Sequence, residues 1–474
     1  MMKTLTLIIL MLAPAIAFAA DQPNIILMLS DDQGWSGLSV VMHPNHPGAK
    51  GTIFHTPNIE RLASQGMRFS AGYAPASVCS PTRISLQTGR SPASLHWTKA
   101  APAEAGHKLT EPRLIKNIAT NETTIGEILR DAGYATAHYG KWHIAGGGPE
   151  KHGFDESDGD TGNENAYQFK DPNPVDIFGM AERTEAFMTK CQKAKKPFFI
   201  QLSWNALHAA ENALEATKAK YANVSAGNNA KQSSVAAITE DLDTGVGRVM
   251  ESIDKLGLAD TTYVIYMSDN GAGGGKRTGL NGGKGTMWEG GIRVPFIVRG
   301  PGVNANSWCD VPVVGYDLYP TFCEWANVPA GKLPKTIEGG SIASLLANNG
   351  QGEVKRAREE LVFHFPHYQS DDGPHSAIRL GDLKLIHFYE SDRDVLFDLS
   401  KDISEQNDLA AEQPRDAEML KKRLMTYLQD VDAQFATPNP DYDPNAEPVS
   451  RKGGKGGMKP TKPKGANGGR RPKD

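Results

Sequence analysis

The chain has 474 residues, of which 39% are hydrophobic and 22% charged, a composition that can bury a large core and excludes a wholly disordered chain or a coiled coil. Its mean hydropathy of −0.43 argues against a protein with several membrane spans. The formal net charge is −4, but nine of the Lys and Arg residues and only one Asp lie in residues 451–474, so the rest of the chain is mildly acidic.

Residues 1–20 have the pattern of a secretory signal peptide. Lys3 supplies the positive start, Leu5–Leu12 is an apolar run, and Ala17-Phe18-Ala19 fits a small-x-small cleavage site. The run is shorter than the ~20 residues that a membrane-spanning helix needs, and no other stretch comes close. We therefore expect an exported protein, periplasmic or secreted, that does not insert stably into a membrane.

The next 300 residues alternate between strand and helix patterns. Thr56-Pro57 predicts a helix start, and Thr124 with Glu127 predicts a capping box. This alternation predicts an α/β catalytic domain over residues 21–355, with a large, mostly parallel sheet flanked by helices. The expected strands are 24–30, 134–139, 197–203 and 263–267, and the expected helices are 56–66, 79–89, 124–133 and 235–256.

After residue 355 the pattern changes to short strands without helices between them. Strands are expected at 361–365, 376–380, 383–388 and 395–399, followed by one helix at 413–432. These predict a smaller C-terminal antiparallel sheet plus helix, residues 356–437. Residues 438–474 are expected to form a disordered basic tail rich in Gly, Pro and Lys, a solubilising segment or alternatively a weak tether to a polyanion.

Acidic side chains follow two of the predicted strands directly. In open α/β sheets, ligands bind at the carboxyl ends of the strands. Asp31, Asp32, Asp269 and Asn270 offer hard oxygen ligands, which suit Ca²⁺, or Mg²⁺, better than a thiolate-seeking metal. Each pair alone is typical of a solvated turn, but two pairs on strand ends favour a metal site.

Five further side chains could surround an anion at the same edge. Each one alone is typical of a solvated charge or a structural imidazole. As a set facing a metal, they predict a site for a multiply charged oxyanion. They are Arg83, Lys141, His143, His208 and Lys284.

The four cysteines are too few for a disulfide scaffold in a chain of this length. Cys309 and Cys323 could pair across a short loop, which the sequence does not decide. Cys79 begins a helix within the polar run 79–83, in what we expect to be a solvent-facing turn. Amide groups at a helix start favour negative charge, which gives some support to a nucleophile at Cys79.

At these residues the sequence resembles the formylglycine-dependent (type I) sulfatases, arylsulfatase-like members of the alkaline phosphatase superfamily. Cys79-Ser80-Pro81-Thr82-Arg83 matches their C-[S/T]-P-x-R modification signature. The matches are ordered over about residues 22–410. The others are Thr56-Pro57-Asn58-Ile59, Thr88-Gly89-Arg90, Gly140-Lys141-Trp142-His143, Ser268-Asp269-Asn270-Gly271, Gly282-Gly283-Lys284-Gly285-Thr286 and Glu289-Gly290-Gly291-Ile292-Arg293-Val294-Pro295.

The resemblance implies that a maturation enzyme oxidises Cys79 to formylglycine (3-oxoalanine), which hydrates to a geminal diol. It also implies one Ca²⁺, held by Asp31, Asp32, Asp269 and Asn270 with the diol at position 79 as a further ligand. The implied substrate is a sulfated carbohydrate or an aryl sulfate, and no nucleic-acid partner is expected.

The resemblance also implies roles for the cationic set. Arg83 and Lys141 would stabilise the diol and the sulfate oxygens. His143 would accept the proton that releases sulfate from the hemiacetal. His208 and Lys284 would contact the sulfate, and one of them would protonate the leaving alcohol.

Two other functions stay open at this point. Phosphodiester or phosphonate hydrolases of the same superfamily usually have Asp-His where this chain has Asp269-Asn270, which favours sulfate. A non-catalytic binder of sulfated glycans would leave Cys79 unmodified. The segment Leu207-His208-Ala209-Ala210 also departs from the Pro-His-x-Pro that is common in the family.

Overall fold

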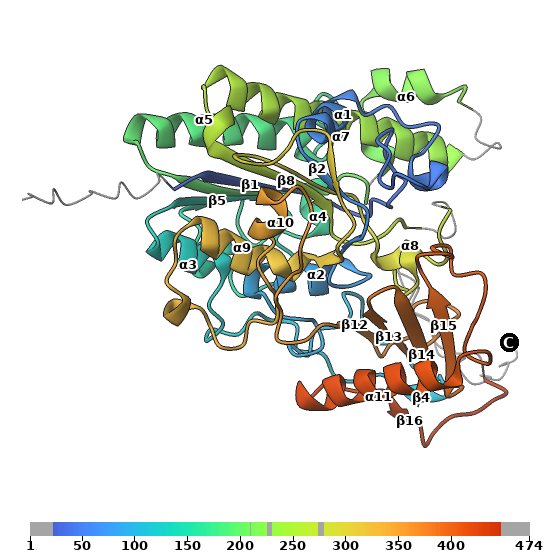
Figure 1. Cartoon of the computed structure of the whole chain (residues 1–474). Coiled ribbons are helices and arrows are strands. Elements are labelled where there is room, and N and C mark those ends of the chain that lie inside the picture. The colour runs from blue at the N-terminus through green and yellow to red at the C-terminus, as the bar shows by residue number, and fades with distance from the viewer. Residues whose placement is uncertain (1–21, 209, 225–229, 274–278, 447–474) are drawn as a thin grey trace, which may run out of the picture.

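The computed structural model describes residues 22–208, 210–224, 230–273 and 279–446. The expected signal peptide, 1–20, and residues 447–474 of the expected tail lie outside the described residues. A large sheet lies between two layers of helices, and a smaller sheet with one long helix packs at one end (Figure 1). Within the described residues, no helix is both long and apolar enough to cross a bilayer.

An eight-stranded sheet forms the centre, in the order β10-β2-β9-β8-β1-β7-β5-β6. Of these strands, only β9 runs antiparallel to its neighbours, β2 and β8. The mostly parallel sheet that the sequence predicts is therefore confirmed. The strands are β1 (Asn24–Ser30), β2 (Met67–Phe69), β5 (Ala135–Gly140), β6 (Glu156–Ser157), β7 (Phe198–Ser203), β8 (Thr262–Ser268), β9 (Phe296–Arg299) and β10 (Ser307–Cys309).

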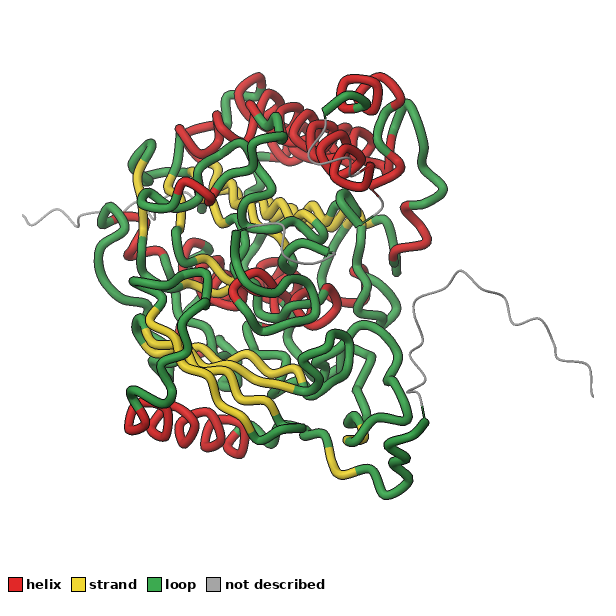
Figure 2. The backbone as a smooth tube through the Cα atoms, turned by 90° about the vertical axis from the view of Figure 1, so that its right-hand side faces the viewer, coloured by secondary structure: helices red, strands yellow, loops and turns green. Residues whose placement is uncertain are grey.

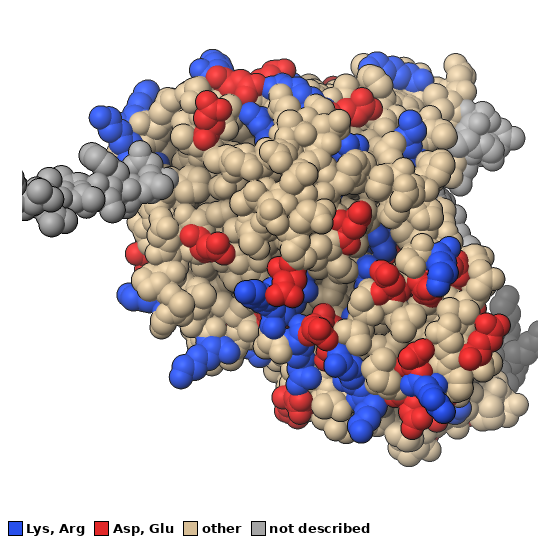
Figure 3. Space-filling view, in the orientation of Figure 1, with Lys and Arg blue, Asp and Glu red and all other residues tan. Residues whose placement is uncertain are grey.

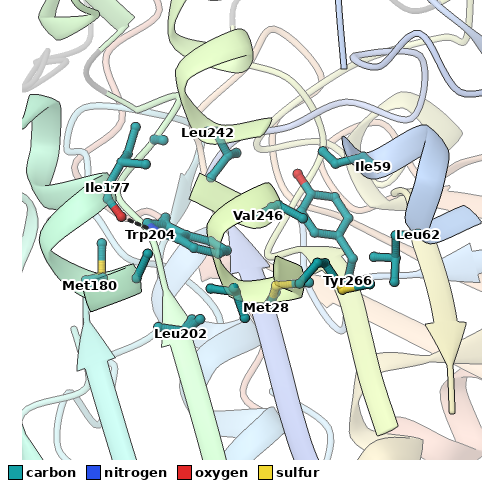
Figure 4. Packing of buried hydrophobic residues seen from close by; sticks show 14 of the residues in the cluster. Met28, Ile59, Leu62, Ile177, Met180, Leu202, Trp204, Leu242, Val246 and Tyr266 are labelled. Carbon is teal, nitrogen blue, oxygen red and sulfur yellow. Dashed lines mark hydrogen bonds between the residues drawn. The ribbon is translucent and has the colours of Figure 1, made fainter. Parts of the chain in front are cut away.

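One face of this sheet is covered by α1 (Pro57–Ser64), α5 (Ile177–Ala194) and α7 (Ala230–Lys255), with α6 (Glu215–Tyr221) packed on α7. Side chains from adjacent strands meet these helices in a continuous apolar layer, which includes Met28, Leu202 and Tyr266 (Figure 4). Fully burying an aliphatic side chain of this kind contributes about 1.5–3 kcal/mol.

The opposite face packs against four other helices. Because side chains alternate along a strand, Ile25, Leu27 and Leu29 of β1 point to this second layer while Ile26 and Met28 point to the first. A strand buried on both faces must be apolar throughout, as the sequence of β1 is. The helices are α2 (Cys79–Thr88), α3 (Ile125–Asp131), α9 (Leu318–Trp325) and α10 (Ala343–Ala347).

The helix starts show one confirmed cap and one difference. Thr124 and Glu127 form the expected capping box of α3. Thr56 does not cap α1, because its hydroxyl bonds to Ser39 instead. The carboxylate of Asp243, from α7, accepts the first free amides of α1, so the cap comes from a distant helix.

Helix α5 is not among the helices expected from the sequence. The buried residues Ile177, Ala181, Thr184, Met188 and Cys191 follow steps of three or four and line one face. This helical spacing can be read in the sequence, but the polar residues between the buried positions make it less distinct.

The C-terminal part is the expected antiparallel sheet plus helix (Figure 2). One face of the sheet packs on the large unit through a layer that includes Tyr73, Met287 and Phe363, and the other lies under α11. This sheet therefore has no solvent-exposed apolar face. Its strands are β12 (Leu361–Phe365), β13 (His375–Leu380), β14 (Leu383–Phe388) and β15 (Arg393–Asp398), and α11 is Pro414–Asp430.

Four short strands and two short helices complete the described elements that bear on the site. β3 (Gly72–Tyr73) pairs with β11 (Val313–Val314), and α4 (Asn163–Ala166) and α8 (Glu289–Ile292) are single turns. β16 (Thr437–Pro438) pairs with β4 (Leu109–Thr110), and Asn439 bonds to Lys108. The segment expected to be disordered from residue 438 therefore starts with paired residues.

All four cysteines are buried and free, so Cys309 and Cys323 do not pair in this structure.

On the surface, acidic and basic side chains are interspersed. They gather over the C-terminal sheet and α11 in the orientation of Figure 1 (Figure 3).

Candidate active site

The carboxyl ends of four adjacent strands, β8, β1, β7 and β5, converge at one edge of the large sheet. Backbone hydrogen bonds continue beyond the strands and hold the next residues in register. The amide of Asp269 donates to Ser30 (3.0 Å), and the amide of Lys141 donates to Ser203 (2.8 Å). Side chains that are more than a hundred residues apart in the chain therefore project into one volume, as the strand pattern predicted.

Three carboxylates and one thiol meet there. Ligand atoms of Asp31, Asp32, Cys79 and Asp269 all lie within 4.8 Å of one another. The Sγ atom of Cys79 is 3.3 Å from Oδ1 of Asp31. Asp32 has a left-handed backbone (φ 63°), a conformation that Asp tolerates, and its amide donates to Asp269 Oδ1 (3.2 Å).

Asn270 provides the strongest sign of a bound cation. Its Nδ2 donates to Asp32 Oδ1 (2.8 Å), but its Oδ1 is buried and has no hydrogen-bond partner among the described residues. A buried acceptor without a partner costs about 1–3 kcal/mol, so such groups call for a ligand. This amide oxygen and the three carboxylates are hard oxygen donors, so the residues present fit a Ca²⁺ ion.

Each carboxylate also accepts a hydrogen bond from a different cation. The Arg83 guanidinium donates to Asp269 Oδ2 (2.7 Å), and Lys141 Nζ to Asp31 Oδ2 (2.5 Å). Lys284 Nζ donates to Asp32 Oδ1 (2.5 Å) and lies 3.3 Å from the Cys79 sulfur. Three negative charges thus face three positive charges, and a divalent cation would make the site net positive.

The crowding of charges shifts the pKa values in opposite directions. Burial would raise the pKa of Asp31, but Lys141 and Arg83 hold it well below its usual range. Burial and the neighbouring Asp31 raise the pKa of Asp269 to about 6, despite Arg83. The two acids compete for the same cations, which a bound metal would relieve.

Cys79 is not in the solvent-facing turn that we expected from the sequence. It starts α2, but its side chain is buried, because Asp31, Asp32 and Lys284 cover the sulfur. Burial, together with Asp269 and Asp31, raises the pKa of the Cys79 thiol. A protonated thiol is a poor nucleophile, so the unmodified side chain is unsuited to attack at neutral pH.

Two histidines, His143 and His208, lie close enough to this cluster to feel its charges. His143 Nδ1 is 3.2 Å from Ser80 Oγ, and burial with Lys141 and Arg83 lowers the pKa of His143 to about 3. His208 Nδ1 is 3.1 Å from the hydroxyl of Tyr167. Burial lowers the pKa of His208 more than Asp31 raises it, so both imidazoles are neutral.

All ten residues predicted for the site therefore lie in one region, linked by contacts or by charge interactions. The sequence missed Ser80 and Tyr167, the partners of the two histidines. Ser80 lies inside the modification signature and could have been considered. Tyr167 follows α4 in a stretch without a recognisable pattern, so no signal in the sequence pointed to it.

Comparisons with known proteins place the chain in a family. A model of the family described as Sulfatase matches residues 23–328, and one described as N-sulphoglucosamine sulphohydrolase, C-terminal, matches residues 282–434. The first match covers more than half of the chain, so the chain belongs to the sulfatase family. The resemblance that the motifs indicated is confirmed, and the protein is a sulfuric ester hydrolase.

Individual relatives agree with this assignment. The chain is 28% identical to a sulfatase of Formosa agariphila, over 84% of this chain and 86% of the relative. It is 29% identical to arylsulfatase A of Homo sapiens, over 81% and 78% of the two chains. The crystal structure of Ps i-CgsB in complex with k-i-k-neocarrahexaose is similar with a TM-score of 0.72 and 25% identity, covering 89% of this chain and 94% of that one.

Proposed function

We propose that this protein is an exported sulfatase that hydrolyses sulfate monoesters of a carbohydrate, using formylglycine made from Cys79 and a bound Ca²⁺. The unpartnered Oδ1 of Asn270, beside three carboxylates and the position 79 side chain, carries the proposal. The carbohydrate substrate is supported by the neocarrahexaose bound to a similar structure.

Asp31, Asp32, Asp269 and Asn270 would hold the Ca²⁺. When present, the ion supplies positive charge, and the hydrated formylglycine supplies an oxygen nucleophile in place of the thiol. Because Cys79 is buried in the folded chain, we expect a maturation enzyme to modify it before this segment folds.

The cationic side chains of the site offset the negative charge of the substrate. A sulfate ester is an anion and repels an incoming nucleophile. Arg83 and Lys141 are fully buried and held by Asp269 and Asp31, so they are already oriented when the ester binds. Preorganised charge of this kind stabilises a transition state without reorganisation at the moment of reaction.

The remaining residues move protons. His143 is neutral, so its imidazole can accept the proton whose removal releases sulfate. Asp32 and Asp31 keep the pKa of Lys284 well above its usual value despite burial, so its ammonium is a permanent donor. Lys284 or His208 protonates the leaving alcohol, a step that contributes ~10²–10⁴-fold in rate.

Mass spectrometry and substrate comparison test this proposal together. The protein is produced with a formylglycine-generating enzyme, and the peptide with residue 79 is expected to carry aldehyde in place of thiol. The purified protein is expected to hydrolyse 4-nitrophenyl sulfate and to prefer it to bis(4-nitrophenyl) phosphate. Turnover by a protein that carries only thiol, or a strong preference for the phosphodiester, would overturn the proposal.

Two further measurements address the substrate and the export. The protein is expected to hydrolyse at least some esters in a panel of sulfated mono- and oligosaccharides. Hydrolysis of aryl sulfates alone would contradict the proposal that the substrate is a carbohydrate. N-terminal sequencing of the protein recovered outside the cytoplasm is expected to begin near residue 21, whereas an intact Met1 would contradict export.

A further inference from the structure

His208 is held by a side chain from a different part of the chain. The hydroxyl of Tyr167 lies 3.1 Å from Nδ1 of His208, and the two ring centroids are 6.5 Å apart. Tyr167 is 39% exposed, so its ring borders solvent next to the catalytic cluster. Among the described residues, Nε2 of His208 has no hydrogen-bond partner, which leaves this atom free for a substrate.

The tautomer of His208 decides what Nε2 can do. A neutral imidazole has one nitrogen that donates and one that accepts. If Nδ1 donated to the Tyr167 oxygen, Nε2 would present a lone pair to the sulfate oxygens and repel them. If Tyr167 donates to Nδ1, the ring proton must lie on Nε2, and the neutral ring donates to the ester. Burial raises the pKa of Tyr167, so its hydroxyl is protonated and able to donate to Nδ1.

We propose that Tyr167 is a positioning residue whose hydroxyl holds His208 in the Nε2–H tautomer, so that the neutral imidazole donates a hydrogen bond to the bridging oxygen of the sulfate ester. This inference rests on the proposed function. In this arrangement His208 stabilises the leaving oxygen by a hydrogen bond and stays neutral, and Lys284 supplies the proton of the alcohol. No imidazolium is required, whose charge the nearby Lys141 and Lys284 oppose.

If Tyr167 fixes the tautomer of His208, its loss has a kinetic effect that the loss of side-chain packing alone would not produce. A donor to the bridging oxygen matters most when the leaving alcohol is a poor leaving group. Sugar alcohols leave poorly, whereas 4-nitrophenol leaves readily without help. Loss of the Tyr167 hydroxyl should therefore slow the hydrolysis of sugar sulfates and leave the hydrolysis of 4-nitrophenyl sulfate nearly unchanged.

NMR of the imidazoles tests the tautomer without relying on turnover. The full chain is labelled with ¹⁵N-histidine, and the His208 signals are assigned by their loss in His208→Gln. The wild-type protein is expected to show Nε2–H, Tyr167→Phe a mixture of tautomers, and the control Tyr442→Phe, a surface tyrosine of similar exposure, no change. An Nδ1–H ring in the wild type, or an unchanged His208 in Tyr167→Phe, overturns the inference.

Kinetics provide the second arm. For Tyr167→Phe we expect kcat on a sugar sulfate to fall about tenfold, the scale of one lost hydrogen bond, with KM within about twofold and 4-nitrophenyl sulfate nearly unaffected. Equal losses on both esters, or a change confined to KM, would contradict the positioning role. Failure of the wild-type protein to hydrolyse any sulfate ester would instead contradict the proposed function.

Discussion

Two of the clusters of buried charges among the described residues can be compared, and one of them is the candidate active site. The catalytic cluster comprises Asp31, Asp32, Cys79, Arg83, Lys141, Asp269, Asn270 and Lys284. The inter-sheet cluster lies where the C-terminal sheet meets the large unit. It comprises Tyr73, Glu289, Arg293, Lys384 and Glu405.

In the inter-sheet cluster three of the four carboxylate oxygens accept hydrogen bonds, and the fourth, Glu405 Oε1, accepts none but forms an ion pair with Lys384. Lys384 Nζ lies 2.8 Å from both Glu289 Oε1 and Glu405 Oε1, and so joins β14 to the large unit. Tyr73 and Arg293 donate to Glu289 Oε2, and the amide of Glu289 donates to Glu405 Oε2 (2.7 Å). Because each carboxylate oxygen faces a donor or the Lys384 ammonium, this cluster has a structural role.

The catalytic cluster differs in two respects that matter. It balances its charges equally well, but it leaves the amide oxygen of Asn270 without a partner and keeps Asp32 and Lys284 partly open to solvent. Burial and ion pairing alone therefore do not mark a site. An acceptor that has neither a donor nor an ion-pair partner, together with access to solvent, does.

The largest effect that separates the clusters is on turnover. Cys79→Ala is expected to reduce kcat on 4-nitrophenyl sulfate by about 10⁴-fold or more, because the nucleophile is lost. The melting temperature should stay close to that of the wild-type protein, since the sulfur holds no charge in the cluster. Near-normal turnover of purified Cys79→Ala would show that position 79 is not the nucleophile.

The inter-sheet cluster is expected to respond in stability instead. Lys384→Met leaves Glu289 and Glu405 buried without their shared cation, which should cost about 3–5 kcal/mol in the free energy of unfolding. Denaturant unfolding measures this loss. The matched control is Lys401→Met, which removes an exposed lysine paired with Asp398 and should change stability little. Equal losses in the free energy of unfolding for the two variants would contradict a structural role of the inter-sheet cluster.

Calcium is expected to act on the catalytic cluster alone. At a free concentration 100-fold above its Kd, a ligand that binds only the folded state adds about 2.7 kcal/mol to the free energy of unfolding. We expect this increase on replacing EGTA with Ca²⁺, and the gain should be much smaller in Asn270→Ala. Glu405→Gln, in the other cluster, should keep the full gain. If Asn270→Ala also kept it, the ion would bind elsewhere.

The smallest effect concerns pH. Burial and Glu289 raise the pKa of Glu405 to about 7 from 4.5, despite Lys384, so the folded state binds more protons than the unfolded state between these values. The contribution of Glu405 to stability is therefore present below about pH 4.5 and lost as the pH rises through 7. Glu405→Gln lacks this titration. Between pH 5 and 7.5 the free energy of unfolding of the wild type should therefore fall, relative to that of Glu405→Gln, by on the order of 1–2 kcal/mol. Parallel stability curves of the two proteins would contradict this titration.

Much of the site could be predicted because its chemistry is local. Asp31 and Asp269 directly follow runs that can only be buried strands, and parallel strands bring their ends together at one edge. The modification signature around Cys79 is contiguous in the chain, so it needs no fold to be recognised. Residues whose role depends on a distant partner gave no such signal, as Tyr167 and Lys384 show.

The sequence by itself predicted a mostly parallel sheet, the polar residues at the ends of four of its strands and position 79 as the candidate reactive residue, because period and adjacency are properties of the chain. Tertiary structure alone decided that the Cys79 sulfur is buried, that Asp243 caps α1 from another helix and that Tyr167 reaches His208. These contacts join segments far apart in the chain, and their energies depend on how the layers pack rather than on any local pattern.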